Sequence, residues 1–483
     1  MNGTQTLRYG SWPSPITVDL AVGSSRGLSE PRQDGDDIYV LESRPDEAGR
    51  VTLLRRTPDG TFTEVAPELN VRTRVHEYGG GAYTATDGVA VFSEFDDNRL
   101  LLKSAPDEAI TELVTEPALR FADMSLDLVR DRVYAVMEDQ TESTIEARNL
   151  LVAVSLADGS MTELAAGHDF YSDPVLSPDG SSLAFVTWDF PQMPWDGTDL
   201  WVAAIEADGT LGEPVHVAGG TEESVIQPKW APDGSLVYVS DRNDWWNLYR
   251  WREGASGSSE VDPMEAEVGG PQWVFGLSEY DIDADGTIYA FAHGPEGARL
   301  LALGSSEAPR EIGFAANGLT YVRVSDGTLT AIAGAFTKPS ALVRIDLASG
   351  VEERLREAST LKVDEAYLST PQHISFPTSG GRTAYAWYYP PTNPDVAAPE
   401  GERPPLVVVS HGGPTSQART SLGLDRQAFT SRGFAVVDVD YGGSTGYGRA
   451  FRDQLREQWG IVDVDDCTAA ATWLAEQGLA DPE

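Results

Sequence analysis

The tetrapeptide His411-Gly412-Gly413-Pro414 has the residue types of an anion-binding turn. It follows the apolar run 406–409, which is typical of a buried parallel strand, and precedes a helical segment and a second apolar run at 434–437. A Gly-Gly turn after such a strand leaves backbone N–H groups without partners, and these groups can stabilise an oxyanion. A tight strand-to-helix turn that binds nothing has the same pattern, so the surrounding sequence must decide between the two.

The elements that would position this turn alternate between strand and helix. This alternation predicts a parallel α/β sheet. The expected elements are a hairpin of 373–376 with 383–389, a Pro-rich loop at 390–405, a strand at 406–410, a helix at about 420–432, a strand at 434–440 and a helix from Val462 to Gln477.

A different pattern fills the chain from about residue 10 to about residue 360. Short β-rich runs are joined by Asp-Gly turns, a dipeptide that supplies the positive φ of tight hairpins. A repeat of roughly 40–50 residues with four short strands is the pattern of propeller blades. Seven units fit: about 10–68, 69–116, 117–167, 168–221, 222–272, 273–314 and 315–360. The predicted fold is therefore an all-β, seven-bladed β-propeller over residues 1–360, followed by a partial α/β domain over residues 361–483.

Composition limits the classes of partner. The chain of 483 residues carries a formal net charge of −41, which disfavours binding to nucleic acid and to anionic membranes. Cys467 is the only cysteine, so no disulfide can form within the chain. No apolar run approaches the length of a membrane span and the first twenty residues lack a signal peptide's apolar core. We expect a cytoplasmic protein.

Three further motifs could carry chemistry. Asp281, Asp283 and Asp285 match the start of an EF-hand loop, but Ala292 stands where a bidentate Glu is required, so we interpret them as a blade turn and expect no metal. Glu77, beside the glycines 79–81, could bind a substrate amine, although an inner blade strand explains it as well. The aromatic stretch 241–249 could stack on a ligand, and we prefer packing between blades.

The chain has a predicted propeller, then a hairpin, a strand ending in His-Gly-Gly-Pro and the run 431–448, which ends in Gly443-Ser444-Thr445-Gly446-Tyr447-Gly448. This order of elements and motifs resembles the prolyl oligopeptidase family of serine peptidases. Within that family, the chain looks most like the acylaminoacyl-peptidase and dipeptidyl-aminopeptidase branch. The resemblance implies a propeller that caps an α/β-hydrolase domain, cleavage of short peptides by a Ser-Asp-His triad, and no cofactor. It also implies that Gly413 gives its N–H to the oxyanion hole. His411 matches a position where dipeptidyl peptidases bind the oxyanion, and a buried His that orders the turn is an equal alternative.

The remaining catalytic residues of such a family are missing from this sequence. No Gly-x-Ser-x-Gly follows the predicted helix from Val462 to Gln477, where the nucleophile elbow would stand, and all six histidines precede the place of the triad His. Ser444 matches the loop after the preceding strand, and not the nucleophile elbow. We expect a chain truncated before the catalytic serine. This chain alone is then inactive, because acyl transfer needs an activated nucleophile.

Two other functions stay open on the sequence alone: a propeller that binds without catalysis, and an esterase on the same hydrolase fold. The expected partner is a peptide substrate, and the sequence leaves an oligomer open. A half-sheet ending on a helix is expected to expose an edge strand, and so to associate or aggregate.

Overall fold

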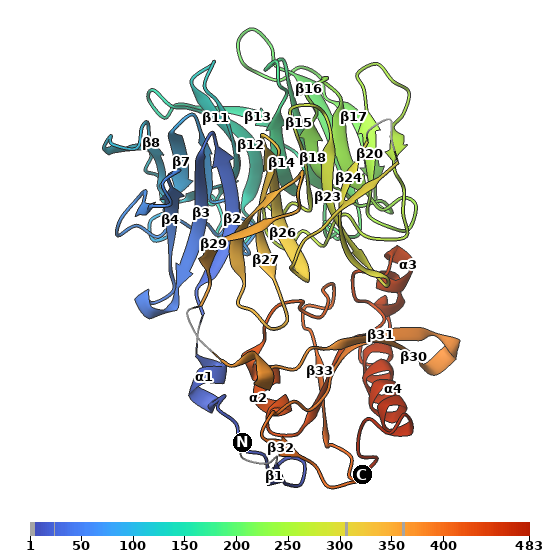
Figure 1. Cartoon of the computed structure of the whole chain (residues 1–483). Helices are drawn as coiled ribbons and strands as arrows, with labels where there is room; N and C mark the ends of the chain where they lie inside the picture. Colours follow the sequence, from blue (N-terminus) through green and yellow to red (C-terminus); the bar gives the residue numbers. More distant parts are fainter. Residues whose placement is uncertain (1–4, 24, 305–307, 360–362) are drawn as a thin grey trace.

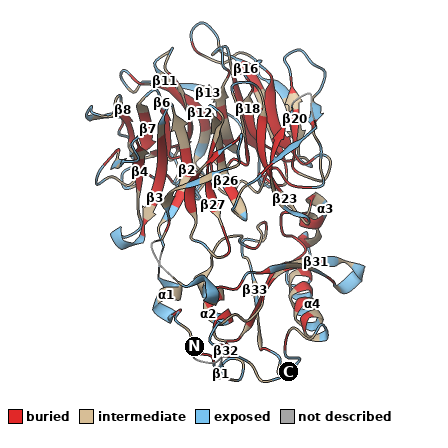
Figure 2. Ribbon diagram, viewed as in Figure 1, coloured by how far each residue is buried: buried red, intermediate tan, exposed pale blue. Residues whose placement is uncertain are grey.

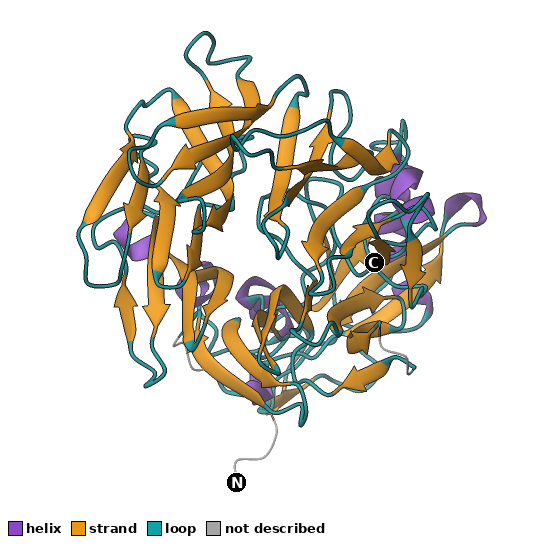
Figure 3. Cartoon of the chain, turned by 90° about the horizontal axis from the view of Figure 1, so that it is seen from above, coloured by secondary structure: helices purple, strands orange, loops and turns teal. Residues whose placement is uncertain are grey.

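The computed structural model shows a ring of β-sheets packed against a smaller mixed sheet with helices (Figure 1). The structure describes residues 5–23, 25–304, 308–359 and 363–483. Seven sheets in this described part have four antiparallel strands each, in the order in which the strands occur along the chain. Seen from above, these sheets stand around a common centre in a propeller-like arrangement (Figure 3).

Each sheet is built from one contiguous stretch of chain. The strands, sheet by sheet, are β2 (Gly27–Asp34), β3 (Asp37–Arg44), β4 (Arg50–Arg56) and β5 (Phe62–Glu64); β6 (Tyr83–Thr86), β7 (Val89–Ser93), β8 (Leu100–Lys103) and β9 (Ile110–Val114); β10 (Leu119–Asp127), β11 (Arg132–Asp139), β12 (Arg148–Ser155) and β13 (Met161–Ala165); β14 (Phe170–Leu176), β15 (Ser182–Trp188), β16 (Thr198–Ala204) and β17 (Val215–Gly220); β18 (Val225–Trp230), β19 (Leu236–Ser240), β20 (Asn247–Trp251) and β21 (Ser259–Val261); β22 (Tyr280–Ile282), β23 (Ile288–Gly294), β24 (Gly297–Leu303) and β25 (Arg310–Ile312); β26 (Gly318–Ser325), β27 (Thr328–Gly334), β28 (Ala341–Asp346) and β29 (Glu352–Glu357). The buried residues concentrate in these strands (Figure 2).

The Asp-Gly turns join the first and second strands of these sheets, as predicted. Gly180, Gly234 and Gly286 have φ of 71°, 77° and 85°, the left-handed region that glycine adopts without steric cost. The Asp281–Asp285 stretch belongs to one of these hairpins, between β22 and β23. Asp281 accepts hydrogen bonds from Lys229 Nζ (2.9 Å) and from the N–H of Val324 (2.8 Å), so its carboxylate already has two partners in the ring.

The first strand of five sheets carries the same β-bulge. At each bulge the register shifts and one non-glycine residue has a positive φ; these residues are Glu30, Asp123, Asp173, Gln227 and Tyr321. Three of their side chains accept a hydrogen bond from a backbone N–H of the next sheet: Glu30 from Gly81 (3.1 Å), Asp123 from Asp173 (2.5 Å), and Gln227 from Glu279 (3.1 Å). A bulge re-aims a side chain and leaves backbone groups unpaired. Here the re-aimed side chains link neighbouring sheets.

The first and seventh sheets contact each other through side chains. Leu28 and Val40 of the first sheet share an apolar cluster with Ile332 of the seventh. Glu42, whose side chain is fully buried, forms ion pairs with Arg44 of its own sheet and with Arg356 of the seventh. This contact joins the two ends of the ring without exchanging a strand.

The C-terminal unit is a mixed sheet with strand order β30-β31-β34-β33. Strands β33 and β34 are parallel, and β31 pairs with both β30 and β34 in antiparallel fashion. The elements are β30 (Gln372–Pro377), β31 (Thr383–Tyr389), β32 (Val396–Ala397), β33 (Leu406–Ser410), α2 (Leu424–Thr430), β34 (Ala435–Asp440), α3 (Arg449–Arg452) and α4 (Val462–Glu476), with short 3-10 turns at Pro45–Glu47, Glu365–Tyr367, Ser379–Gly381 and Asp453–Leu455. Helix α4 packs Ala470 and Leu474 on the sheet. The hairpin, both strands and α4 lie where the sequence predicted them. Helix α2 is shorter than predicted, because the chain before Leu424 is irregular.

The N-terminal segment lies with this C-terminal unit, which differs from the expected grouping of residues 1–360 in the propeller. Strand β1 (Gln5–Thr6) pairs with β32, and α1 (Val18–Val22) lies against α2. Trp12 stacks on the backbone at Gly433. These contacts join residues about 390 to 420 apart in the sequence, which no local pattern encodes. The expected boundary near residue 360 falls on 360–362, outside the described residues.

Two other expectations concern exposed and buried surfaces. Trp246, in the aromatic stretch 241–249, is fully buried, which confirms packing for this residue. Strand β33 lies at an edge of its sheet, and Val408 is 39% exposed there. Whether this edge causes association stays a prediction.

In the described residues, no helix is both long enough and apolar enough to cross a membrane.

Glu42→Gln tests the contact between the first and seventh sheets. We expect the free energy of unfolding to fall by about 3 kcal/mol, because breaking the pair with the buried Glu42 leaves the guanidinium of Arg356 without its counter-charge. Urea unfolding followed by tryptophan fluorescence measures this change. The control is Glu353→Gln on β29, where Glu353 forms an exposed pair with Arg344; a change within about 0.5 kcal/mol is expected there. Equal effects of the two substitutions would contradict the assigned role of Glu42.

Candidate functional site

The His-Gly-Gly-Pro turn lies at the C-terminal end of β33, beside the end of the parallel strand β34. Gly412 and Gly413 are exposed, and within the described residues their N–H groups donate no hydrogen bond. Gly413 has φ of +73°, so a side chain at this position would strain the backbone. The turn therefore presents two free backbone donors in a conformation that requires glycine, which is the arrangement expected of an anion-binding loop.

His411 is fixed by its neighbours rather than directed outward. Its Nε2 lies 2.7 Å from Oγ of Ser444, which is fully buried, and its ring stacks on Tyr441 with centroids 4.5 Å apart. The Tyr441 hydroxyl also donates to the carbonyl of His411 (3.2 Å). Burial lowers the pKa of His411, so the ring is neutral at pH 7. This geometry favours a His that orders the turn.

The chain after the turn is tied to both units. The N–H of Thr445 donates to the carbonyl of Ser416 (2.8 Å), and Nε1 of Trp273 donates to the carbonyl of Thr415 (2.7 Å). A Cβ at Gly413 would lie 3.5 Å from the Trp273 ring. Trp273 comes from the ring of sheets, so the anion-binding turn and that ring are in direct contact.

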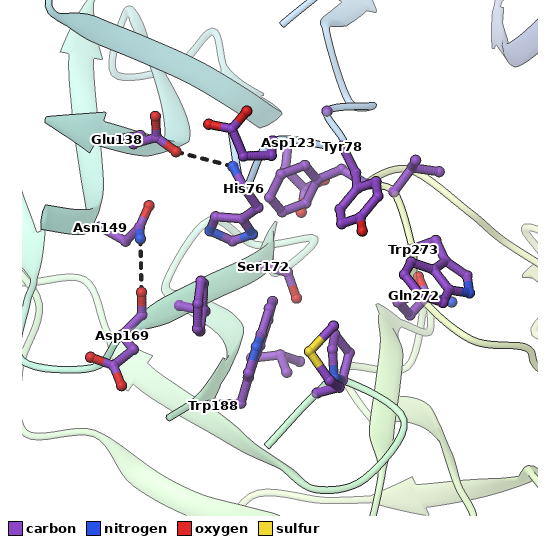
Figure 4. Close-up of a pocket in the computed structure, with 18 of the residues that line it drawn as sticks. His76, Tyr78, Asp123, Glu138, Asn149, Asp169, Ser172, Trp188, Gln272 and Trp273 are labelled. Carbon is purple, nitrogen blue, oxygen red and sulfur yellow. Dashed lines mark hydrogen bonds between the residues drawn. The ribbon is translucent and has the colours of Figure 1, made fainter. Parts of the chain in front are cut away.

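Trp273 also forms part of the wall of a cavity of about 880 Å³ inside the ring of sheets (Figure 4). Aromatic side chains dominate the wall and carboxylates lie between them; the lining includes His76, Phe170, Trp188, Trp195 and Phe275 with Asp123, Glu138 and Asp169. A cavity of this size and lining suits a small ligand with an apolar body and a cationic group. A second cavity of about 490 Å³ shares Trp195 and Trp273 with the first and reaches Pro414 and Thr415.

The structure places Glu77 at the opening of this cavity. Its side chain is 79% exposed, its backbone has φ of +66°, and Arg120 lies 3.6 Å from its carboxylate. Glu77 is thus available to a ligand without being held in one orientation. It is not part of an inner strand, because the segment before β6 is irregular.

A neighbouring carboxylate, Glu138, is buried and already bonded. It accepts hydrogen bonds from the N–H of His76 (3.1 Å), from Arg120 (2.7 Å) and from Gln140 (2.8 Å). Burial lowers the pKa of His76 to about 3, so this ring is neutral, and it packs edge-on against Phe170 and Trp188. These contacts keep the cavity wall rigid beside the exposed Glu77.

Sequence patterns did not reveal Trp273 or the wall residues contributed by β14 and β15. Trp273 follows Gly269, Gly270 and Pro271 in a stretch without strand alternation, a pattern that indicates only a loop. Its approach to the His-Gly-Gly-Pro turn depends on how the two units pack. The aromatic residues of β14 and β15 alternate like any half-buried strand, so their pattern did not single them out.

Buried carboxylates hold the loop that follows β34. The N–H of Gly442 donates to Asp466 on α4 (2.8 Å), and that of Gly448 donates to Glu267 in the ring of sheets (3.1 Å). The N–H of Ala450 donates to Asp244 (2.6 Å). Asp241, fully buried, forms ion pairs with Arg449 (2.6 Å) and Arg452 (2.5 Å). These bonds fix α3 and its preceding loop to the fifth sheet.

Comparison with known proteins agrees with this geometry. Residues 420–483 match the sequence pattern of the prolyl oligopeptidase family. A solved puromycin-hydrolyzing peptidase of Mycobacterium tuberculosis is 39% identical, with a TM-score of 0.91 over 99% of this chain and 76% of that one. The chain belongs to the prolyl oligopeptidase family. A solved puromycin hydrolase is also similar, at 37% identity and a TM-score of 0.90 with the same coverage.

Curated members of the family match over shorter stretches. The acylamino-acid-releasing enzyme of Arabidopsis thaliana is 37% identical over 82 residues, which are 17% of this chain and 11% of that protein. The first curated relatives align over 20% and 11% of their own length, so less than two thirds of each is represented. The relatives carry peptidase names, as the family resemblance implied.

Ser444→Ala tests the contact that fixes His411. Removing the hydroxyl should cost about 1 kcal/mol of unfolding free energy and release the imidazole from a single tautomer. Urea unfolding measures the first effect, and ¹⁵N NMR of the histidine rings measures the second. Ser416→Ala is the control, because in the described part of the chain the Ser416 hydroxyl forms no hydrogen bond. An unchanged His411 spectrum in Ser444→Ala would contradict the assigned contact.

Proposed function

We propose that this chain is the propeller and the first part of the α/β-hydrolase domain of a serine-type peptidase that cleaves short peptides or acyl-peptides. In this proposal the seven sheets form a closed seven-bladed propeller, and the mixed sheet from residue 363 onward, with the segment 5–22, belongs to the hydrolase domain. A cytoplasmic location fits a chain whose single cysteine is Cys467.

One observation carries the proposal: two free N–H donors at Gly412–Gly413 lie beside a cavity that the propeller encloses. Hydrolysis of an amide passes through a tetrahedral intermediate whose oxygen carries negative charge. A preorganised backbone donor lowers the energy of that charge, because it needs no reorientation during the reaction. Gly413 supplies such a donor. His411, held by Ser444 and Tyr441, keeps the turn in place.

The attacking group of the reaction comes from residues beyond this sequence. Family members use a serine in Gly-x-Ser-x-Gly, activated by a His and an Asp, to form an acyl-enzyme. No such motif follows α4 in this sequence, and the match at 442–446 centres on Ser444, which is buried in the loop after β34 and bonded to His411. The roles proposed for this chain are therefore to bind the substrate and to stabilise the oxyanion.

The cavity indicates the class of substrate. Aromatic walls bury an apolar group, and carboxylates attract an ammonium group. The similar solved proteins are named for hydrolysing puromycin, an aminoacyl compound with a free amino group and aromatic rings. Aminoacyl amides and short peptides with a free amino terminus therefore fit this cavity better than lipid esters do.

Covalent labelling tests the peptidase assignment. A longer product of the same locus that includes a Gly-x-Ser-x-Gly motif should react with a fluorophosphonate probe and hydrolyse aminoacyl amides. The chain of 483 residues should do neither, since it lacks the nucleophile. Intact mass spectrometry measures the adduct. A locus that ends after codon 483 without such a motif, or a longer product that resists the probe, would favour the non-catalytic binding protein.

Glu77→Gln in the longer product tests the amine anchor. We expect the KM for free-amine substrates to rise roughly threefold to fivefold, because an exposed ion pair contributes at most about 1 kcal/mol. The KM for the matching N-acetyl substrates should not change. Glu163→Gln, on the exposed face of β13, is the control. Unchanged kinetics with free-amine substrates would exclude Glu77 as the anchor.

A further inference from the structure

A buried carboxylate connects the oxyanion turn to the loop after β34. Asp440 is the last residue of β34 and is 2% exposed. Its Oδ1 accepts the N–H of Ala418 at 2.7 Å, and its Oδ2 accepts the hydroxyl of Tyr447 at 2.8 Å. Ala418 ends the segment that begins with the turn at His411. One side chain therefore bonds both segments.

The donors around Asp440 form a directed chain. The Tyr447 hydroxyl has one proton and donates it to Asp440, so its 3.0 Å contact with Nε2 of His373 requires the histidine to donate. Burial lowers the pKa of His373, and the ring also contacts the backbone of Pro295. Tyr447 is held flat against Tyr385, with ring centroids 4.1 Å apart. The Ala418 N–H and the Tyr447 hydroxyl thus both point toward the carboxylate of Asp440.

The segment 411–418 depends on few bonds. At its start His411 contacts Ser444, in its middle the carbonyls of Thr415 and Ser416 accept hydrogen bonds, and at its end the N–H of Ala418 bonds to Asp440. Without the last bond, the segment would be held only through His411, Thr415 and Ser416. The N–H of Gly413 would then be less firmly placed, and a misplaced donor loses most of its effect on an oxyanion.

We propose that Asp440 is a positioning residue, which holds the segment 411–418 so that the N–H of Gly413 faces the reacting carbonyl. The effect of Asp440 on catalysis, as inferred here, rests on the proposed peptidase function. Its structural part, the tether of Ala418, does not depend on activity.

The ionised form of Asp440 is the one that satisfies both donors. A protonated carboxyl carries a hydrogen on one oxygen, so either the Ala418 N–H or the Tyr447 hydroxyl would lose an acceptor. Burial raises the pKa of Asp440 to about 7, while the Ala418 and Tyr447 bonds act in the opposite direction. Tyr389, Asp438, Tyr441 and Tyr447 are the titratable groups facing it. Of these, Asp438 is paired with Arg426, and its negative charge acts to raise the pKa of Asp440.

Two pH effects of opposite sign follow. Within the folded protein, the bond to Ala418 favours the ionised carboxylate, so the tether strengthens as pH rises through about 7. Relative to the unfolded chain, where Asp titrates near 3.9, the folded carboxyl holds its proton more tightly. The contribution of Asp440 to global stability therefore falls as pH rises from about 4 to about 7 and is constant above that range.

Hydrogen exchange of the 483-residue chain tests the tether without any activity. In Asp440→Asn the backbone amide of Ala418 should exchange roughly fivefold to tenfold faster at pH 8, because the Asn side chain cannot accept both donors. In the wild type, protection of Ala418, corrected for intrinsic exchange, should fall between pH 8 and pH 6. The variant should show no such fall. Mass spectrometry of the peptic peptides measures both.

Two further variants keep the test decisive. Tyr447→Phe removes one donor and retains the carboxylate, so it should abolish the bond to His373 and leave Ala418 protected; it also serves if Asp440→Asn does not fold. Asp466→Asn is the matched control, a fully buried carboxylate that bonds Gly442 of the same loop but not the segment 411–418. Exchange at 411–418 that is equal in wild type and Asp440→Asn overturns the proposal.

Kinetics of the longer product test the catalytic meaning. Asp440→Asn should lower kcat roughly tenfold or more with KM nearly unchanged, since a transition-state interaction is affected. The acid limb of the kcat profile near pH 7, to which the triad His also contributes, should become shallower in the variant. An inactive wild type would refute the peptidase function and leave the exchange result standing. Faster exchange with unchanged kcat would overturn the link between Asp440 and the reaction.

Discussion

The glycine-rich loop 442–450 is largely buried, so its N–H groups must find acceptors; those of Gly443 and Ser444 bond to nearby carbonyls, and others bond to distant elements. An unpaired buried N–H costs free energy comparable to a lost hydrogen bond. Carboxylates meet this requirement: Asp466 from α4, and Glu267 and Asp244 from the ring of sheets. Because these acceptors come from both units, satisfying the loop also fixes how the units sit against each other.

The same arrangement positions the candidate oxyanion turn. The loop contributes Ser444 and Thr445, which contact His411 and Ser416, and Asp440 just before it holds Ala418. The ring of sheets contributes Trp273 on the other side. The turn is therefore held between two rigid supports, as a preorganised donor requires. Holding the turn in this way requires acidic side chains to be buried, and burial raises the pKa of Glu267 to about 7.

Much of the local structure was predictable, because it depends on neighbours in sequence. The Asp-Gly hairpins, the strand before His411 and the helix at Val462 each follow from the residues that form them. The place of residues 5–22 was not predictable, since β1 pairs with a strand about 390 residues away. The aromatic cavity was not predictable either, because it also depends on contacts between segments far apart in the sequence. Its walls come from several sheets, and each wall residue looks like an ordinary strand or loop residue in its own stretch of sequence.

Sequence by itself determined the repeat of short strands, the change to alternating strand and helix, and the family resemblance, which in turn implies Gly413 as the oxyanion donor. These features need only local backbone preference and motif spacing. Tertiary structure decided that Glu77 lies at the opening of a cavity, that His411 is bonded to Ser444, and that Asp440 joins the two segments around the turn. The physical reason is that buried polar groups select partners by proximity in the folded chain, and that proximity depends on packing between segments far apart in sequence.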